Sequence, residues 1–110
     1  MKWAFSIEEV NETEFDLVAT ATVDPEYHIY STSMPDMGPM PTVFEIEPNE
    51  FFELVGTGRD VTPGQKYYDD IFEVEYVQFA GTATYAQRLK KLTDRPFVVV
   101  GDISSQACGR

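Results

Sequence analysis

The sequence predicts an all-β fold, a sandwich of about seven to nine short strands in two sheets. Hydrophobic and polar residues alternate with a period of two along most of the 110 residues, as in strands with one buried face. Clusters of Gly, Pro, Asn and Asp separate these segments at short intervals. Short strands joined by regular turns are typical of an immunoglobulin-like β-sandwich. The length fits a single domain over residues 1–110, and 43% hydrophobic residues supply an adequate core.

The first strands are expected to form a hairpin. Hydrophobic residues alternate with polar or small ones through residues 3–7 and again through 15–23, on either side of a polar turn at 11–13. A short third strand is expected at residues 28–31, because an Asp-Pro-Glu turn comes before it.

The rest of the chain also favours strands over helices. Residues 85–92 contain good helix formers, but the Thr-Ala-Thr-Tyr sequence that leads into them favours a strand. Gly101 predicts a bulge that would re-aim the chain toward Cys108. Further strands are expected at residues 43–47, 51–55, 66–68, 74–79, 82–92 and 97–107, with turns at 48–49, 56–58, 63–64, 81 and 94–96.

The charge balance argues against a nucleic-acid partner. Acidic residues number 19 and basic residues 8, which gives a formal net charge of −11. Binding polyphosphate requires clustered Lys and Arg, and the one basic cluster covers residues 88–91. No apolar run approaches the roughly 20 residues of a membrane helix, and no signal-peptide pattern begins the chain.

Cys108 is the single cysteine, so it has no partner for an internal disulfide. It also lacks the other soft ligands of a zinc site. A spare thiol is one interpretation. However, a strand-forming segment that stops two residues after a cysteine predicts that the natural chain continues past Arg110.

The methionines of the proline-rich segment 31–42 allow two interpretations. Met34, Met37 and Met40 recur at a spacing of three, and thioethers select Cu(I), with His28 as a possible fourth ligand. Alternatively, the segment is a crossover loop whose methionines fill gaps at the end of the core.

Asp69 and Asp70 also allow two interpretations. Neighbouring carboxylates on a strand point to opposite faces and form no acid–base pair. On a loop they could raise the pKa of a buried reactive group, or they could form a solvated acidic turn. His28, the single histidine, is expected to be a structural strand residue, since no nucleophile elbow accompanies it.

Taken together, these segments resemble the N-terminal periplasmic domain of the DsbD thiol–disulfide interchange family. The resemblance extends over nearly the whole chain, and its specific parts are the Gly-Pro-x-Pro-Thr loop and the terminal Gln-Ala-Cys. The matching sequences are YHIYS at 27–31, MPD at 34–36, GP at 38–39, PT at 41–42, YDDIF at 68–72, Gln87, and QAC at 106–108.

The resemblance implies an immunoglobulin-like domain in the periplasm with a redox-active cysteine pair and no cofactor. Such domains receive electrons from transmembrane and thioredoxin-like domains of the same polypeptide and pass them to periplasmic thioredoxin-like proteins. By this analogy Cys108 is the first cysteine, and Tyr30, Asp69 and Asp70 line its site. Ile71 and Phe72 would belong to a cap loop that shields the cysteines.

The departure from the family is the second cysteine, which the 110 residues do not contain. Exchange needs an attacking thiolate and a resolving thiol, so Cys108 alone could be trapped but could not cycle. We therefore expect the second cysteine after Arg110. The alternative is a non-catalytic β-sandwich that binds partner proteins in the cell envelope. The acidic balance also predicts that the pKa of Cys108 does not fall below that of a free thiol.

Overall fold

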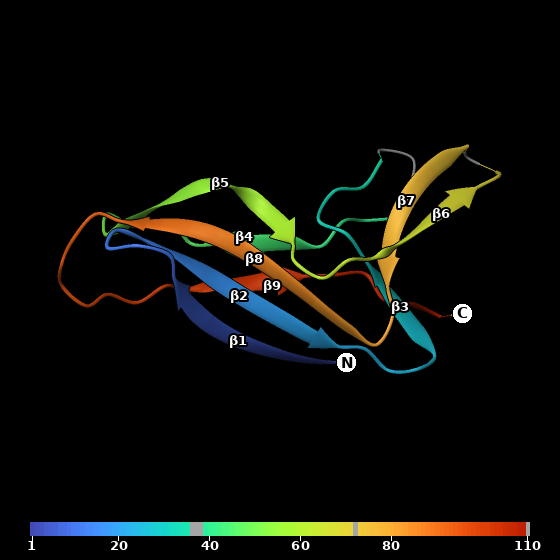
Figure 1. Ribbon diagram of the computed structural model, residues 1–110, viewed down its shortest axis with the longest axis horizontal. Coiled ribbons are helices and arrows are strands. Elements are labelled where there is room, and N and C mark those ends of the chain that lie inside the picture. The colour runs from blue at the N-terminus through green and yellow to red at the C-terminus, as the bar shows by residue number, and fades with distance from the viewer. Residues whose placement is uncertain (36–38, 72, 110) are drawn as a thin grey trace.

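The computed structural model describes residues 1–35, 39–71 and 73–109, and it confirms the all-β prediction. The described residues form ten strands and no helix (Figure 1). The segment 82–91 is a strand, as expected despite its helix-forming residues. The strands are β1 (Lys2–Glu9), β2 (Glu14–Thr22), β3 (Tyr27–Tyr30), β4 (Val43–Ile46), β5 (Phe52–Asp60), β6 (Gln65–Asp69), β7 (Val74–Phe79), β8 (Thr82–Lys91), β9 (Gly101–Ser104) and β10 (Cys108–Gly109).

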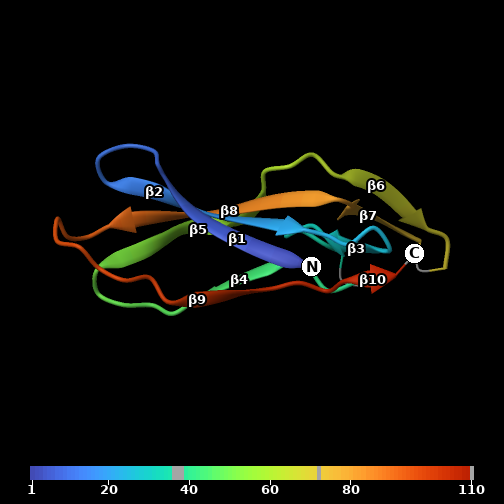
Figure 2. The same cartoon turned by 90° about the horizontal axis from the view of Figure 1, so that it is seen from below.

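The strands form three antiparallel sheets in an elongated molecule of 50 × 26 × 21 Å. The first sheet has the order β1-β2-β8-β5, and its long strands run along the molecule (Figures 1 and 2). The second sheet, β10-β3-β7-β6, occupies the end that carries the C-terminus. The β4–β9 ribbon packs its Phe44, Ile46 and Ile103 against the first sheet, which makes the second layer of the sandwich.

The core follows the predicted alternation along β2 and β8. Most inward residues of these two central strands are fully or almost fully buried, and several are alanines that allow the layers to approach closely. Tyr85 is the largest of the fully buried side chains among the described residues. The buried hydrophobic residues on this inward face are Phe15, Ala19 and Ala21 of β2 and Ala83, Tyr85 and Leu89 of β8.

The prediction of a turn at residues 56–58 was wrong, because β5 continues through them to Asp60. The pairing of β5 with β8 shifts register between Val55 and Arg59, so the two glycines form an irregularity within a strand. Gly56 has a φ of 71°, a backbone conformation that glycine adopts without steric cost. The glycines that predicted a turn therefore lie in a bulge of the edge strand β5.

The single long strand predicted for residues 97–107 was also wrong. Only β9 pairs within this range, and Gly101 lies opposite Ile46 in a continuous register, so Gly101 is not a bulge. A Cβ at Gly101 would lie 2.6 Å from the carbonyl oxygen of Glu45, so close approach of β4 explains the glycine. The chain leaves β9 at Ser104 and pairs again only at Cys108.

The segment 31–42 connects β3 of the second sheet to β4 of the ribbon, as the crossover interpretation predicts. Its start is held by Asp60 at the end of β5. That carboxylate accepts hydrogen bonds from the Ser31 hydroxyl and from the backbone N–H and hydroxyl of Thr32, the last two at 2.9 and 3.0 Å. These contacts fix the point at which the chain leaves β3.

Candidate functional site

Cys108 enters the second sheet as part of its short edge strand. β10 pairs with β3, so that Cys108 lies opposite His28 and Gly109 opposite Tyr27. Tyr30, which the sequence placed at the same site, is two residues farther along β3. The register therefore brings the predicted residues Cys108 and Tyr30 to neighbouring strands.

A row of aromatic rings crosses this sheet from β3 to β6. The buried hydroxyl of Tyr30 lies 3.0 Å from Nε2 of His28, and the two rings meet edge-on at 5.4 Å. Tyr76 of β7 contacts the Tyr30 ring edge-on at 5.8 Å and stacks on Tyr67 of β6 at 6.2 Å. The row, formed by His28, Tyr30, Tyr76 and Tyr67, begins opposite Cys108 and ends on the outer strand of the sheet.

Tyr67 and Tyr76 were not predicted as members of this row. Tyr67 was part of a predicted strand, and Tyr76 lay within another, but neither was singled out. The available signal was that both occupy strands next to one another in the chain, where a hairpin places aromatic residues directly opposite each other.

Buried hydroxyl groups hold the backbone of Tyr30 in place. The Tyr30 carbonyl accepts hydrogen bonds from the hydroxyls of Tyr85, at 2.8 Å, and Thr42, at 2.7 Å. Thr42 Oγ1 also lies 3.0 Å from Oγ of Ser105, in the segment that leads to Cys108. Burial raises the pKa of Tyr85, so its hydroxyl stays protonated and remains a donor. The same cluster thus anchors both chain segments of the candidate site.

Asp69, Asp70 and Ile71 lie together at the turn between β6 and β7. The carboxylate of the half-buried Asp69 accepts a hydrogen bond of 2.8 Å from the backbone N–H of Ile71. Asp70 is exposed, and the Ile71 side chain is 86% exposed. The other predicted cap residue, Phe72, lies outside the described residues. The turn therefore presents an apolar side chain to solvent beside an acidic group.

This turn and Cys108 lie at different edges of the second sheet. β10 and β6 are its two outer strands, and β3 and β7 lie between them. Along β7, the partner of Asp69 is Val74, five residues from the partner of Ile29, which corresponds to about 17 Å. The structure thus places Tyr30 on the strand next to Cys108, and it places Asp69 and Asp70 at the opposite edge of the same sheet.

Two of the three methionines of the copper interpretation lie in the described residues. Met34 is half-buried and Met40 is exposed, with its backbone N–H donating to Gln106 Oε1 at 2.8 Å. Met37 lies outside the described residues. Within the described ranges, no group of three His, Cys, Asp or Glu side chains is arranged to hold a metal ion. The Cu(I) site stays a prediction.

The fold and this site define the class as an all-β sandwich with a cysteine on an edge strand beside an aromatic row. Comparison with protein-family models, with curated proteins and with solved structures finds no match for the chain. In the part of the chain that the structure describes, no helix has the length and apolar character needed to cross a membrane.

Proposed function

We propose that the chain is a periplasmic thiol–disulfide interchange domain of the DsbD type. It would receive electrons from a membrane-embedded reductase and pass them to thioredoxin-like proteins, with Cys108 as the reacting thiol. The observation that carries the proposal is the pairing of the Cys108 strand with β3, two residues from the buried Tyr30. The resemblance described above makes both residues parts of one site.

The exchange step is a thiolate displacement. The Cys108 thiol loses its proton to solvent, and the thiolate attacks one sulfur of the partner's disulfide. A new sulfur–sulfur bond forms while the old one breaks, and the electron pair leaves on the partner's second sulfur. A resolving thiol of this protein must then attack Cys108, which leaves the partner reduced and this domain oxidised. The proposal therefore requires a second cysteine after Arg110.

The β6–β7 turn supports a role in partner docking. Ile71 is almost fully exposed, and Tyr68 on the preceding strand is also exposed. Exposed apolar side chains of this kind are suited to contact a partner protein. We expect a thioredoxin-like protein to contact this turn while its disulfide reaches the edge strand.

The test is capture of a covalent intermediate. A thioredoxin-like domain with its second cysteine replaced by serine is activated at the first cysteine as a mixed disulfide with thionitrobenzoate. Mixed with the 110-residue chain, it should yield a disulfide-linked conjugate and one equivalent of released thionitrobenzoate. Cys108→Ser should yield neither. Absence of conjugate with the wild-type chain would contradict the proposal.

The second candidate is a non-catalytic module that binds partner proteins, which the exposed β6–β7 turn also favours. The two functions differ in whether they require the Cys108 thiol. Binding of the thioredoxin-like domain, followed by calorimetry, would be equal for Cys108→Ser and wild type if the module only binds. In that case, the wild-type chain would form the conjugate no faster than an ordinary thiol does.

A further inference from the structure

The first sheet has one protected edge and one unprotected edge. β5, at one side, carries the register shift between Val55 and Arg59, and such irregularities prevent a strand from pairing with another chain. β1, at the other side, pairs with β2 in an unbroken register over all eight of its residues. It contains no proline, and in Figure 1 it forms the lower margin of the ribbon. Its outward N–H and C=O groups are therefore available to a further strand.

The inward face of β1 is also unusually apolar for an edge. Phe5 is 57% exposed and Ile7 is 64% exposed, although both point toward the second layer of the sandwich. The Trp3 ring covers one side of Phe5, with the two rings stacked at 6.5 Å. The remaining surface of Phe5 and Ile7 is left open along the edge of the sheet.

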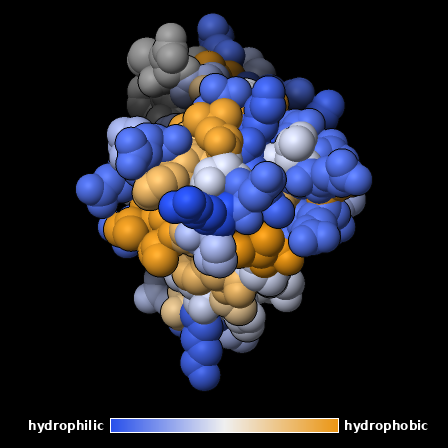
Figure 3. All heavy atoms as spheres, turned by 90° about the vertical axis from the view of Figure 1, so that its left-hand side faces the viewer, coloured by the Kyte–Doolittle hydropathy of each residue, from blue (hydrophilic) through white to orange (hydrophobic). Residues whose placement is uncertain are grey.

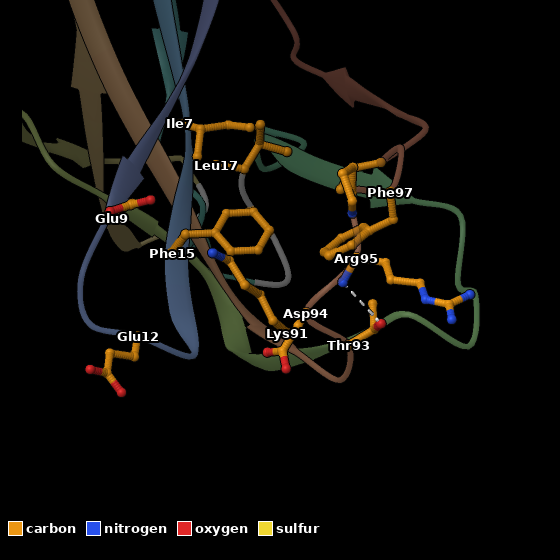
Figure 4. Close-up of a pocket in the computed structure, with 12 residues that line it drawn as sticks. Ile7, Glu9, Glu12, Phe15, Leu17, Lys91, Thr93, Asp94, Arg95 and Phe97 are labelled. Atoms are coloured by element: carbon orange, nitrogen blue, oxygen red, sulfur yellow. Dashed lines mark hydrogen bonds between the residues drawn. The ribbon is translucent and has the colours of Figure 1, made fainter.

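A groove between the layers opens beside these side chains. Ile7, Phe15, Leu17 and Phe97 point toward a common space of about 490 Å³ (Figure 4). Apolar side chains also gather at this end of the molecule in the space-filling view (Figure 3). A smaller hollow lined by Phe5 and Phe44 lies farther along β1. An added strand at β1 would cover the mouth of both spaces.

The charges of β1 indicate what that strand is. Lys2 begins the strand and Glu8 lies near its end, with Phe5 midway between them. If a second copy of β1 pairs antiparallel about a two-fold axis through Phe5, Lys2 of each copy lies opposite Glu8 of the other. The same register places Phe5 against Phe5 and Trp3 against Ile7, with all three apolar residues on one face.

We propose that the chain forms a two-fold dimer through antiparallel pairing of β1 with β1 of a second copy. The two first sheets join into one continuous eight-stranded sheet, and the apolar inward faces of the two edge strands meet. Because the interface is isologous, each contact away from the axis occurs twice, and the Phe5–Phe5 contact on the axis occurs once. This surface lies on a different sheet from Cys108, so the dimer is independent of the proposed exchange function.

The charge pairs provide the sharpest test of the register. Sedimentation equilibrium of the wild-type chain should give a monomer–dimer equilibrium. Lys2→Glu and Glu8→Lys should each weaken the dimer about tenfold or more, since each replaces two opposite-charge pairs with two like-charge pairs. The double variant Lys2→Glu/Glu8→Lys should restore the wild-type dissociation constant. A monomeric wild type, or a double variant no better than the single ones, would overturn the proposal.

A substitution at the axis tests the apolar contact. Phe5→Asp brings two carboxylates together and should leave only monomer, while the circular dichroism spectrum stays native because Phe5 is more than half exposed. Leu54→Asp, at an exposed position of similar size on β5, is the matched control and should keep the dimer. Dimer in Phe5→Asp, or its loss in both variants, would contradict pairing at β1.

Crosslinking gives a readout that does not depend on affinity. In a Cys108→Ser background, Phe5→Cys should form an intermolecular disulfide on mild oxidation, because directly opposite Cβ atoms lie about 4.5–5.5 Å apart. Ile7→Cys is the control, since the two copies of residue 7 are offset by four residues, or about 13 Å. Equal crosslinking at both positions would reject the two-fold axis at Phe5.

Discussion

At the scale of single residues, Asp16 shows what the sequence pattern concealed. It occupies an outward position on β2 yet is buried, because Arg88 Nε donates to its Oδ1 at 2.6 Å and Arg59 donates to its Oδ2 at 2.7 Å. The hydrogen bond from Arg88 and that from Arg59 hold the pKa of this carboxyl below its ordinary value of 3.8, although burial opposes them. Asp16 therefore connects β2 to β8 and β5 across the outer face of the first sheet.

This arrangement predicts how stability depends on pH. Because the folded-state pKa lies below the unfolded value of 3.8, the stabilisation is complete above that value and is lost as the pH falls below it. Asp16→Asn should lower the free energy of unfolding by about 2 kcal/mol at pH 7, the magnitude of hydrogen bonds to a charged group. Urea unfolding at pH 7 and near pH 2.5 checks this. The difference between variant and wild type should shrink at the lower pH, and a constant difference would contradict the account.

Individual site residues were predictable only where a motif marked them. Tyr30 and Cys108 were named from the segments YHIYS and QAC, and they occupy neighbouring strands. Tyr76 carries no motif, and its place in the aromatic row depends on the pairing of β7 with both β3 and β6. Pairing between strands distant in sequence cannot be obtained from period-two alternation, which describes each strand by itself.

At the scale of elements, β4 approaches closely to Gly101, the first residue of β9. A methyl group there would lie 2.6 Å from the Glu45 carbonyl oxygen and 3.0 Å from the Ile46 Cα, and both atoms are backbone. Backbone atoms cannot move away through a change of rotamer, as the end of a flexible side chain can. The pairing of the whole β4–β9 ribbon therefore depends on glycine at this position.

We expect Gly101→Ala to lower the free energy of unfolding by about 2 kcal/mol, the usual cost of forcing an extra methyl group into a packed site. Ser104→Ala, at the exposed end of the same strand, is the control and should change stability little. Thermal denaturation followed by circular dichroism compares the two variants. Equal melting temperatures of the two variants would contradict the prediction, because they would show that β4 and β9 can move apart at Gly101 without loss of stability.

A substitution in the β6–β7 turn can test partner docking without changing the stability of the fold. Ile71 contributes little to the core because its side chain is almost fully exposed. Ile71→Asp should therefore leave the melting temperature unchanged while slowing conjugate formation with the activated thioredoxin-like domain about tenfold. Val98→Asp, at another highly exposed apolar position, is the matched control. Equal rates for both variants would exclude the turn from the docking surface.

The incorrect predictions at the glycines share a physical cause. Gly56 and Gly58 were interpreted as a turn, and Gly101 as a bulge, from the local backbone freedom of glycine. In the structure, Gly56 lies in a register shift of β5 and Gly101 lies against β4. Whether a glycine provides a turn, a bulge or space depends on what packs against it, which is a tertiary property.

At the scale of the whole molecule, repulsion among the charges behind the net charge of −11 destabilises the folded state. Raising the salt concentration from about 0.01 to about 0.15 M shortens the screening length from about 30 to about 8 Å and should relieve this self-repulsion. We expect the melting temperature to rise by a few degrees, measured by calorimetry at fixed protein concentration. A fall in melting temperature would mean that attractive pairs such as Asp16–Arg88 dominate the electrostatics.

The all-β class was predictable because alternation and turn residues are local signals that cover most of the chain. The arrangement of ten strands into three sheets was not, since it depends on which edges meet. The same limit applies to the site: the sequence placed Asp69 beside Cys108, whereas the register puts them at different edges of one sheet.

The central claim is that Cys108 exchanges selectively with a thioredoxin-like protein. The most direct measurement compares two rate constants for thionitrobenzoate release by the wild-type chain. One is for the activated thioredoxin-like domain, and the other is for the neutral mixed disulfide of thionitrobenzoate with 2-mercaptoethanol, which has the same leaving group. We expect a reaction at least tenfold faster with the protein disulfide. A rate equal to or below that of the small disulfide, as expected for an ordinary thiol, would contradict this prediction.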